Sequence, residues 1–292
     1  MRCLPGVIAG ILLAVSAGVP SAIAVAAPAP SAFATPVASV SLPTLAREDT
    51  MHTAVPEVLV AAPRLTLDEI LDRITRAERR RDSLLVDESF VATMRLMHAK
   101  NEDAPPSLLE ESVVQVYRKK PDMARTLLLR HRRDKSEKGG SEVQVDFRSD
   151  MSEQIVNFAF RPEARRDYRY HIVGRDVAGN QLVYRIRFEP KSSLDPSQPS
   201  GTVWVNTNDF VIVRQELEFT RSPVPLILKG VDRMVVERQK IGEFWVLRRV
   251  LLRARFTFPM PRLGRRIDVG LQFDDFRLNS GLPDSLFAKA TR

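Results

Sequence analysis

The sequence has almost no cysteine: of its 292 residues only Cys3 is one, and it lies at the very start of the chain. This excludes a disulfide scaffold and any zinc or iron–sulfur site that depends on several cysteine ligands. Histidine and glycine are also scarce, with 4 and 13 residues, and so little glycine excludes a collagen-like chain. What is present is 44% hydrophobic residues and 44 Lys+Arg against 36 Asp+Glu, which predicts a folded core instead of global disorder.

Arrangements that suit catalysis are equally rare. His98, His131 and His171 lie on different predicted segments, and the H-E-x-x-H pattern of helical zinc sites is absent. The sequence contains no nucleophile elbow, phosphate-binding loop or dinucleotide-binding fingerprint. We therefore expect no catalytic residue, no metal and no cofactor, and we interpret the chain as a non-enzymatic protein.

Two pairs of neighbouring acids are the features on which a hydrolase hypothesis rests. They are Glu110 with Glu111 and Asp274 with Asp275, and paired carboxylates can perform acid–base chemistry when burial separates their pKa values. Neighbouring residues of a strand point to opposite faces, so each pair is expected to be one exposed acid plus one acid at a strand edge.

The N-terminus has the character of a secretory signal peptide. Arg2 precedes an apolar stretch from Val7 to Ala27, and small residues follow at the spacing that signal peptidase recognises, in Ala22-Ile23-Ala24 and Ala32-Phe33-Ala34. A retained membrane anchor is the alternative, although Pro20 weakens a spanning helix. We expect the chain to be exported to the periplasm and the signal peptide to be cleaved.

The composition changes after this segment. Residues 35–62 are rich in alanine, proline, serine and threonine without sustained periodicity, which is typical of a flexible linker. The expected organisation is therefore a signal peptide at 1–34, this linker, and one folded domain at 63–292. That length is ordinary for a single all-β domain.

One helix is predicted at the start of the folded domain. Thr66 can cap it, Glu69 can complete a capping box, and Leu65 can pack against Ile70 across the cap. Apolar residues continue at helical spacing through about Arg81, so we expect one side of the helix to lie on an apolar surface.

After Asp82 the apolar residues recur with a period of two, which predicts strands joined by short turns into an antiparallel sheet. The predicted strands are residues 90–96, 113–119, 123–130, 143–147, 154–160, 168–173, 181–188, 202–206, 210–219, 226–238, 244–258 and 267–278.

The predicted sheet is too wide for one helix to cover. About eleven strands at ~4.8 Å spacing span roughly 50 Å, whereas a helix of some sixteen residues is about 24 Å long and ~10 Å across. We therefore predict a mainly β (α+β) fold: a strongly curved antiparallel sheet forming an unclosed barrel, with the N-terminal helix as a plug or lid. A sandwich of two sheets is the structural alternative.

Apolar residues of the strands are candidates to line a ligand cavity, and they could equally fill a packed core, because both use the same residue types. The cavity candidates are Phe90, Met94, Phe158, Tyr184, Phe188, Trp204, Phe219, Phe244, Phe256 and Phe273.

Arginine-rich runs alternate with the strands, and Arg79, Arg80 and Arg81 are the candidates for a basic docking surface. Arginine offers phosphate a planar fork of donors, so anionic membrane or lipopolysaccharide headgroups are the partners that suit an exported protein. Nucleic acid is not expected, because the chain lacks an aromatic nucleic-acid motif and is predicted to be exported. The alternative is a solvated basic face without a partner.

The order of elements and one hairpin resemble the outer-membrane lipoprotein-sorting carrier superfamily, which is LolA-like and includes LolB and the RseB N-terminal domain. The hairpin reads Gly201-Thr202-Val203-Trp204-Val205-Asn206-Thr207-Asn208-Asp209-Phe210-Val211-Ile212-Val213-Arg214. In that family a Val-Trp-Val strand, a short polar turn and an apolar strand ending in a basic residue recur, and the fold is an unclosed β-barrel with a helical lid over an apolar cavity.

The resemblance implies a LolA-like domain of the periplasm or cell envelope. Such a domain would bind a lipid, an acyl chain or a lipidated or hydrophobic partner in an apolar cavity, as a lipoprotein carrier in transport or as an envelope sensor. The alternative is a non-catalytic envelope interaction module with a dry core and a basic docking surface.

Overall fold

A computed structural model describes residues 65–133, 155–178, 181–192, 198–222, 226–261 and 263–288. The predicted signal peptide and linker lie outside the described residues, and so does the predicted strand at 143–147. The boundaries proposed for the N-terminal segments therefore stay predictions.

Helix α2 (Leu67–Leu84) begins where the capping residues predict. The Thr66 hydroxyl accepts the Glu69 backbone N–H at 3.3 Å, and the Glu69 carboxylate accepts the Thr66 backbone N–H at 2.8 Å. The helix ends at Leu84, about one turn beyond the predicted end. Within the described part of the chain, no helix combines the length and the apolar character needed to cross a bilayer.

In the part of the chain that the structure describes, ten strands form one antiparallel sheet. They are β1 (Asp87–Ala99), β2 (Ser107–Lys119), β3 (Met123–Arg133), β4 (Tyr168–Ala178), β5 (Gln181–Pro190), β6 (Ser200–Asn206), β7 (Ile212–Glu218), β8 (Leu228–Ile241), β9 (Phe244–Met260) and β10 (Gly264–Leu278). Their order is β3-β2-β1-β10-β9-β8-β7-β6-β5-β4. The first and last of the described strands, β1 and β10, are therefore paired neighbours inside the sheet.

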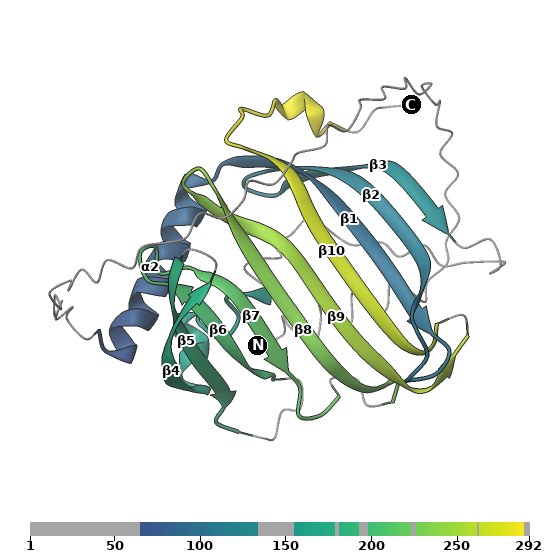
Figure 1. Cartoon of the computed structure of the whole chain (residues 1–292). Coiled ribbons are helices and arrows are strands. Elements are labelled where there is room, and N and C mark those ends of the chain that lie inside the picture. The colour runs from purple at the N-terminus through teal and green to yellow at the C-terminus, as the bar shows by residue number, and fades with distance from the viewer. Residues whose placement is uncertain are drawn as a thin grey trace, which may run out of the picture. The chain divides into compact units, whose positions relative to one another are not determined.

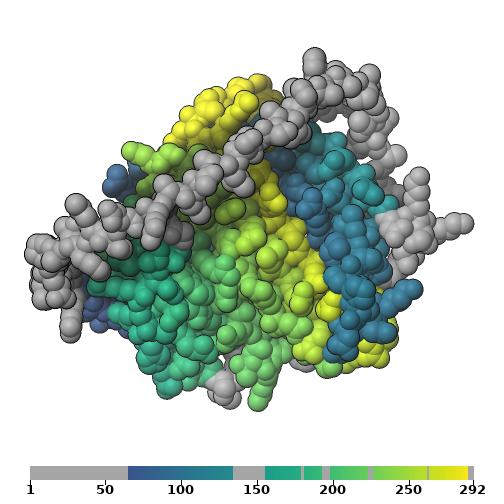
Figure 2. All heavy atoms as spheres, viewed as in Figure 1, coloured from purple at the N-terminus to yellow at the C-terminus, as the bar shows by residue number. Residues whose placement is uncertain are grey.

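Figure 1 shows the strong curvature of this sheet, with β10 beside β1. In the space-filling view the yellow atoms of β10 likewise lie between the green of β8 and the blue of β1 (Figure 2). Strands β3 and β4 are the two edges and do not pair with each other, so the barrel is unclosed. The predicted fold class, one strongly curved antiparallel sheet, is confirmed. The described residues form ten strands where about eleven were predicted, and they do not form the alternative two-sheet sandwich.

The two faces of the sheet differ sharply in polarity. Inward-pointing residues of the strands form one large apolar cluster with Ile70, Leu71 and Ile74 of α2, so the helix packs on this face. We call it the inner face, and the opposite side the outer face. Charged side chains such as Arg249 and Arg253 occupy the outer face, where they are exposed.

Residues 155–160 correct one prediction, because they form a helical turn and further turns where the alternation predicted a strand. The buried apolar residues of the segment are Ile155, Val156, Ala159 and Phe160. Their spacing fits a helical face better than an alternating strand, and all four join the apolar cluster. The segment leads into the one-turn helix α4 (Pro162–Arg165), so α2 is not alone on the inner face.

Candidate functional site

The inner face carries an unbroken row of side chains across seven strands. Cross-strand pairing joins Ile186, Val203, Gln215, Val236, Val250, Leu271 and Met94 in that order. Every member except Gln215 is apolar, and none is more than 4% exposed. We call this series the inner row. Across these seven strands the inner face is a wall of hydrocarbon that Gln215 interrupts.

Most of the predicted cavity residues lie at this wall. Phe90, Met94, Tyr184, Phe188, Phe256 and Phe273 are buried members of the large apolar cluster. Phe158 and Phe219 are partly buried and pack against it. Trp204 belongs to a second, smaller cluster, and the Arg214 guanidinium lies 5.5 Å from the centre of its ring. Phe244 is half-buried at the start of β9 and lines a hollow beside α2.

A cluster of aromatic side chains packs together at β4 and β5. The ring centres of Phe160, Tyr170 and Phe188 lie about 5.5 Å apart in successive contacts, and Tyr168 adds further edge contacts to Phe188. The Tyr170 hydroxyl donates to the Ala159 carbonyl, and burial raises the pKa of Tyr170 above its ordinary value of 10. The phenol therefore stays neutral. The signal for this group was the alternation of Tyr168 and Tyr170, which sequence reasoning did not single out.

Gln215 is the polar exception in the inner row. Its side chain is fully buried, and within the described structure neither its amide nitrogen nor its amide oxygen has a hydrogen-bond partner. A buried polar group without a partner costs about 1–3 kcal/mol. A water or a polar group of a bound molecule would satisfy it. The sequence signal was a polar residue at an inward-pointing position of an otherwise apolar strand.

A buried ion pair holds α2 on the inner face. Both Glu78 carboxylate oxygens accept from the Arg238 guanidinium, at 2.5 Å and 3.1 Å, and the Arg238 side chain is only 1% exposed. Burial opposes the charged form of Glu78, but the adjacent Arg238 charge outweighs it and holds the pKa of Glu78 below its ordinary value. Arg81 adds a hydrogen bond of 3.0 Å to the Trp245 carbonyl on β9.

The structure divides the predicted basic run between two hollows on opposite sides of α2. Arg80 and Arg81 line a hollow of about 540 Å³, which α2 forms with the tips of the β6–β7 and β8–β9 hairpins. Arg79 and Arg81 line another of about 330 Å³, which α2 forms with residues 157–163. Successive helical residues point in directions about 100° apart, so three in a row cannot share one surface.

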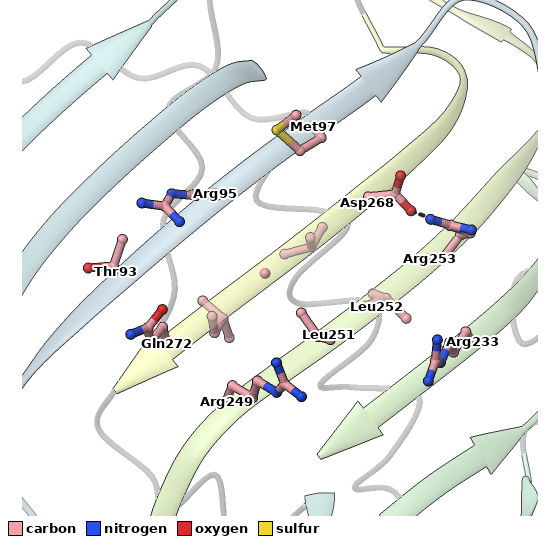
Figure 3. A pocket seen from close by; sticks show the side chains of 13 residues that line it. Thr93, Arg95, Met97, Arg233, Arg249, Leu251, Leu252, Arg253, Asp268 and Gln272 are labelled. Atoms are coloured by element: carbon pink, nitrogen blue, oxygen red, sulfur yellow. Dashed lines mark hydrogen bonds and ion pairs between the residues drawn. The ribbon is translucent and has the colours of Figure 1, made fainter. Parts of the chain in front are cut away.

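The outer face carries a third depression, of about 380 Å³, which is lined by Gly270 and by its neighbours on β1 and β9. Figure 3 shows the labelled side chains around it. Four arginines surround it, and each contacts an acid: Arg95 with Glu111 at 2.7 Å, Arg249 with Glu237 at 2.6 Å, Arg253 with Asp268 at 2.5 Å and Arg233 with Glu216 at 3.8 Å. These arginines are already compensated, so this depression belongs to an ion-pair lattice that covers the outer face.

The carboxylate pairs do not form a catalytic arrangement. Glu110 and Glu111 are both buried, at 1% and 9% exposed, which corrects the expectation of one exposed acid. Each contacts an arginine guanidinium, at 3.0 Å and 2.7 Å, and these arginines cover them. Asp274 and Asp275 are both exposed. No group of three or more potential metal ligands occurs among the residues that the structure describes.

Comparisons with known proteins give similarities of fold. No family model and no curated protein matches the chain. A LolA superfamily protein from Nitrosomonas europaea is 15% identical with a TM-score of 0.34, and the match covers 77% of this chain and 98% of that one. A DUF1329 family protein from Desulfovibrio piger is 17% identical with a TM-score of 0.35, covering 76% of this chain and 96% of that one.

Lipoprotein LppX from Mycobacterium tuberculosis is 10% identical with a TM-score of 0.28, and the match covers 75% of this chain and 99% of that one. The predicted resemblance to the LolA-like superfamily is thus confirmed as a resemblance to solved structures of that description. Every one of these TM-scores is below 0.5, so the functional inference below rests on the residues of this chain.

Proposed function

We propose that the chain is an exported protein of the periplasm or cell envelope that binds the acyl chain of a lipid, or of a lipidated or hydrophobic partner, on its inner face. The inner row is the observation that supports this proposal. It crosses seven adjacent strands with a single polar side chain, Gln215, and its members are covered by the packed interior, so an acyl chain that displaced part of this packing would meet apolar side chains at every other position.

Binding of this kind needs no chemistry beyond burial. A chain of 14 to 18 carbons buried at ~0.8 kcal/mol per methylene gains on the order of 10 kcal/mol before ordering costs are subtracted. That gain is enough for retention at about micromolar dissociation constants. Uptake and release would be reversible, and no catalytic residue is assigned.

The proposal is tested on protein purified without detergent. Organic extraction followed by mass spectrometry should recover an acyl lipid, and delipidated protein should bind a fluorescent fatty acid at about micromolar concentration. Absence of both a co-purified lipid and probe binding would reject the proposal.

A matched pair of variants locates the binding. Val250 lies in the inner row, and Leu251 follows it on β9 with its side chain on the outer face. Val250→Phe should fill part of the interior and weaken fatty-acid binding, whereas Leu251→Phe adds the same side chain outside and should leave binding unchanged. Equal effects of both variants would place the fatty acid elsewhere.

A non-catalytic envelope interaction module with a dry core is the second candidate. It is favoured by the close packing of the interior, where Phe160, Phe188 and Phe273 are among the largest fully buried side chains. In that case wild-type protein takes up no fatty acid but captures a partner through its basic surface. Because Arg79 and Arg80 line different hollows, charge reversal at each residue separately shows which hollow the partner uses.

A further inference from the structure

The hollow between α2 and the two hairpin tips, which we call the hairpin hollow, collects cations from one side of the helix. Arg73, Arg76 and Arg80 are spaced three and four residues apart, so they lie on the same helical face. The opposite wall consists of residues 208–211 and 242–245 at the ends of the hairpins. The hollow measures about 540 Å³, which is ample room for a small anion.

These three arginines differ from the other arginines that surround a depression. Among the described residues, no carboxylate forms an ion pair with Arg73, Arg76 or Arg80. In the outer-face depression every guanidinium has an acidic neighbour in contact. Glu69 and Asp72 attract Arg73 and Arg76 from one turn earlier on α2, but among the described residues no carboxylate is close enough to form an ion pair with the three guanidiniums in the hairpin hollow.

The acids that line the hollow do not pair with these three arginines. Asp209 is occupied, since one carboxylate oxygen accepts from Lys240 Nζ at 2.7 Å and from Trp245 Nε1 at 2.8 Å. Lys240 pairs with Asp209, and Arg81 donates to the Trp245 carbonyl and lies beside Glu78. The lining cations Arg73, Arg76 and Arg80 therefore face Glu243 as the remaining lining acid.

Side-chain and backbone contacts hold the β6–β7 hairpin tip in place at the hollow. The Arg73 guanidinium lies 4.8 Å from the centre of the Phe210 ring, and that ring stacks on Tyr184 of the inner face at 6.5 Å. Phe210 has a φ of 53°, which non-glycine residues adopt at a cost. The side-chain oxygen of Asn206 holds the turn in place by accepting the backbone N–H groups of Asn208 and Asp209 at 2.8 Å and 2.9 Å.

We propose that the hairpin hollow binds a phosphate group, carried by an anionic lipid headgroup or free in solution. Several guanidiniums around one small cavity suit a tetrahedral anion of more than one charge, because each offers a planar fork of donors. A guanidinium stacked on an aromatic ring keeps its edge N–H groups available for such an acceptor. The inference is independent of acyl-chain binding on the inner face.

The test compares two triple variants that lose the same charge. The site variant is Arg73→Gln, Arg76→Gln and Arg80→Gln, and glutamine keeps the helix propensity of α2. The control variant is Arg169→Gln, Arg221→Gln and Arg248→Gln, at exposed positions away from the hollow. Circular dichroism establishes that both variants keep the fold.

Two probes separate the sources of the phosphate. Pyrophosphate binding is measured by calorimetry, and binding to phosphatidylglycerol vesicles is measured by flotation against phosphatidylcholine vesicles. Each arginine near an anionic membrane contributes roughly fivefold to binding, so the site variant should lose about a hundredfold on phosphatidylglycerol. The control variant should lose much less.

Each outcome decides the proposal. Selective loss of pyrophosphate binding in the site variant assigns a free phosphate, and selective loss of phosphatidylglycerol binding assigns a lipid headgroup. Equal loss in the site and control variants would show that net charge alone attracts the probes, and would overturn the proposal. Failure of the wild-type protein to bind either probe would overturn it as well.

Discussion

The ion pair between Glu78 and Arg238 should anchor α2 to the sheet. The Arg238 side chain is almost fully buried, and its guanidinium donates to both oxygens of the Glu78 carboxylate. Glu78→Gln removes the negative charge that both guanidinium contacts of Arg238 to Glu78 rely on. Breaking a buried pair from one side typically costs about 3–5 kcal/mol, so we expect a loss of that order in the free energy of unfolding.

A double-mutant cycle isolates the pair. Replacing both partners, with Glu78→Leu and Arg238→Met, removes both desolvated charges and should recover most of the loss, because apolar replacements of buried pairs are often neutral. Glu163→Gln, at an exposed position of α4, serves as the control and should change the free energy of unfolding by less than about 0.5 kcal/mol. Urea unfolding followed by circular dichroism measures Glu78→Gln, the control, and the members of the cycle, which are Glu78→Leu alone, Arg238→Met alone and both together.

The pH dependence gives an independent check with a fixed sign. Because Arg238 holds the pKa of Glu78 below its ordinary value of 4.5, the pair contributes its full stability above that pH. The contribution is lost as the pH falls through the lowered folded-state pKa. The difference between wild type and Glu78→Gln should therefore shrink on acidification below pH 4.5. A difference under about 1 kcal/mol at neutral pH, or one that does not change with pH, would refute this account of α2 docking.

Three further substitutions test other parts of the fold by urea unfolding. Gln215→Leu should raise the free energy of unfolding by about 1–3 kcal/mol, because two buried polar atoms lack partners; a lower midpoint would show that the amide is hydrogen-bonded in solution. Gly201→Ala should lower it by about 1–3 kcal/mol, because a Cβ would collide with the Glu216 carbonyl across the β6–β7 pair; an unchanged midpoint would contradict that clash. Asp87→Asn should cost about 1–3 kcal/mol and speed amide exchange at 280–282, whose N–H groups the carboxylate accepts at 2.8–3.4 Å; unchanged exchange rates would argue against this bond.

The sequence predicted those features whose causes are local. The start of α2 follows from Thr66 and Glu69, which lie three residues apart and cap each other. The strands follow from alternation, and the curvature follows from the shortage of helix. Residues 155–160 were wrongly predicted as a strand because five of the six are apolar, so the sequence did not show which of them would be buried at helical spacing.

The features that the sequence did not predict depend on long-range pairing. Nothing in β1 or β10 indicates that the first and last strands pair, so the inner row could not be assembled from sequence. Alternation places Val203 and Val205 on one face and Trp204 on the other, but it does not say which face lies inward. The separation of Arg79 from Arg80 depends on what packs on each side of α2.

The two proposed sites meet at one aromatic contact, so their independence can be measured. Arg73 of the hairpin hollow lies over Phe210, and Phe210 stacks on Tyr184 of the inner face. If the sites act separately, the Val250→Phe variant loses fatty-acid binding and keeps phosphatidylglycerol binding, while the variant without Arg73, Arg76 and Arg80 does the reverse. A ligand that carries both an acyl chain and a phosphate would instead couple them, and either variant would then weaken its binding by more than it weakens the simple probes.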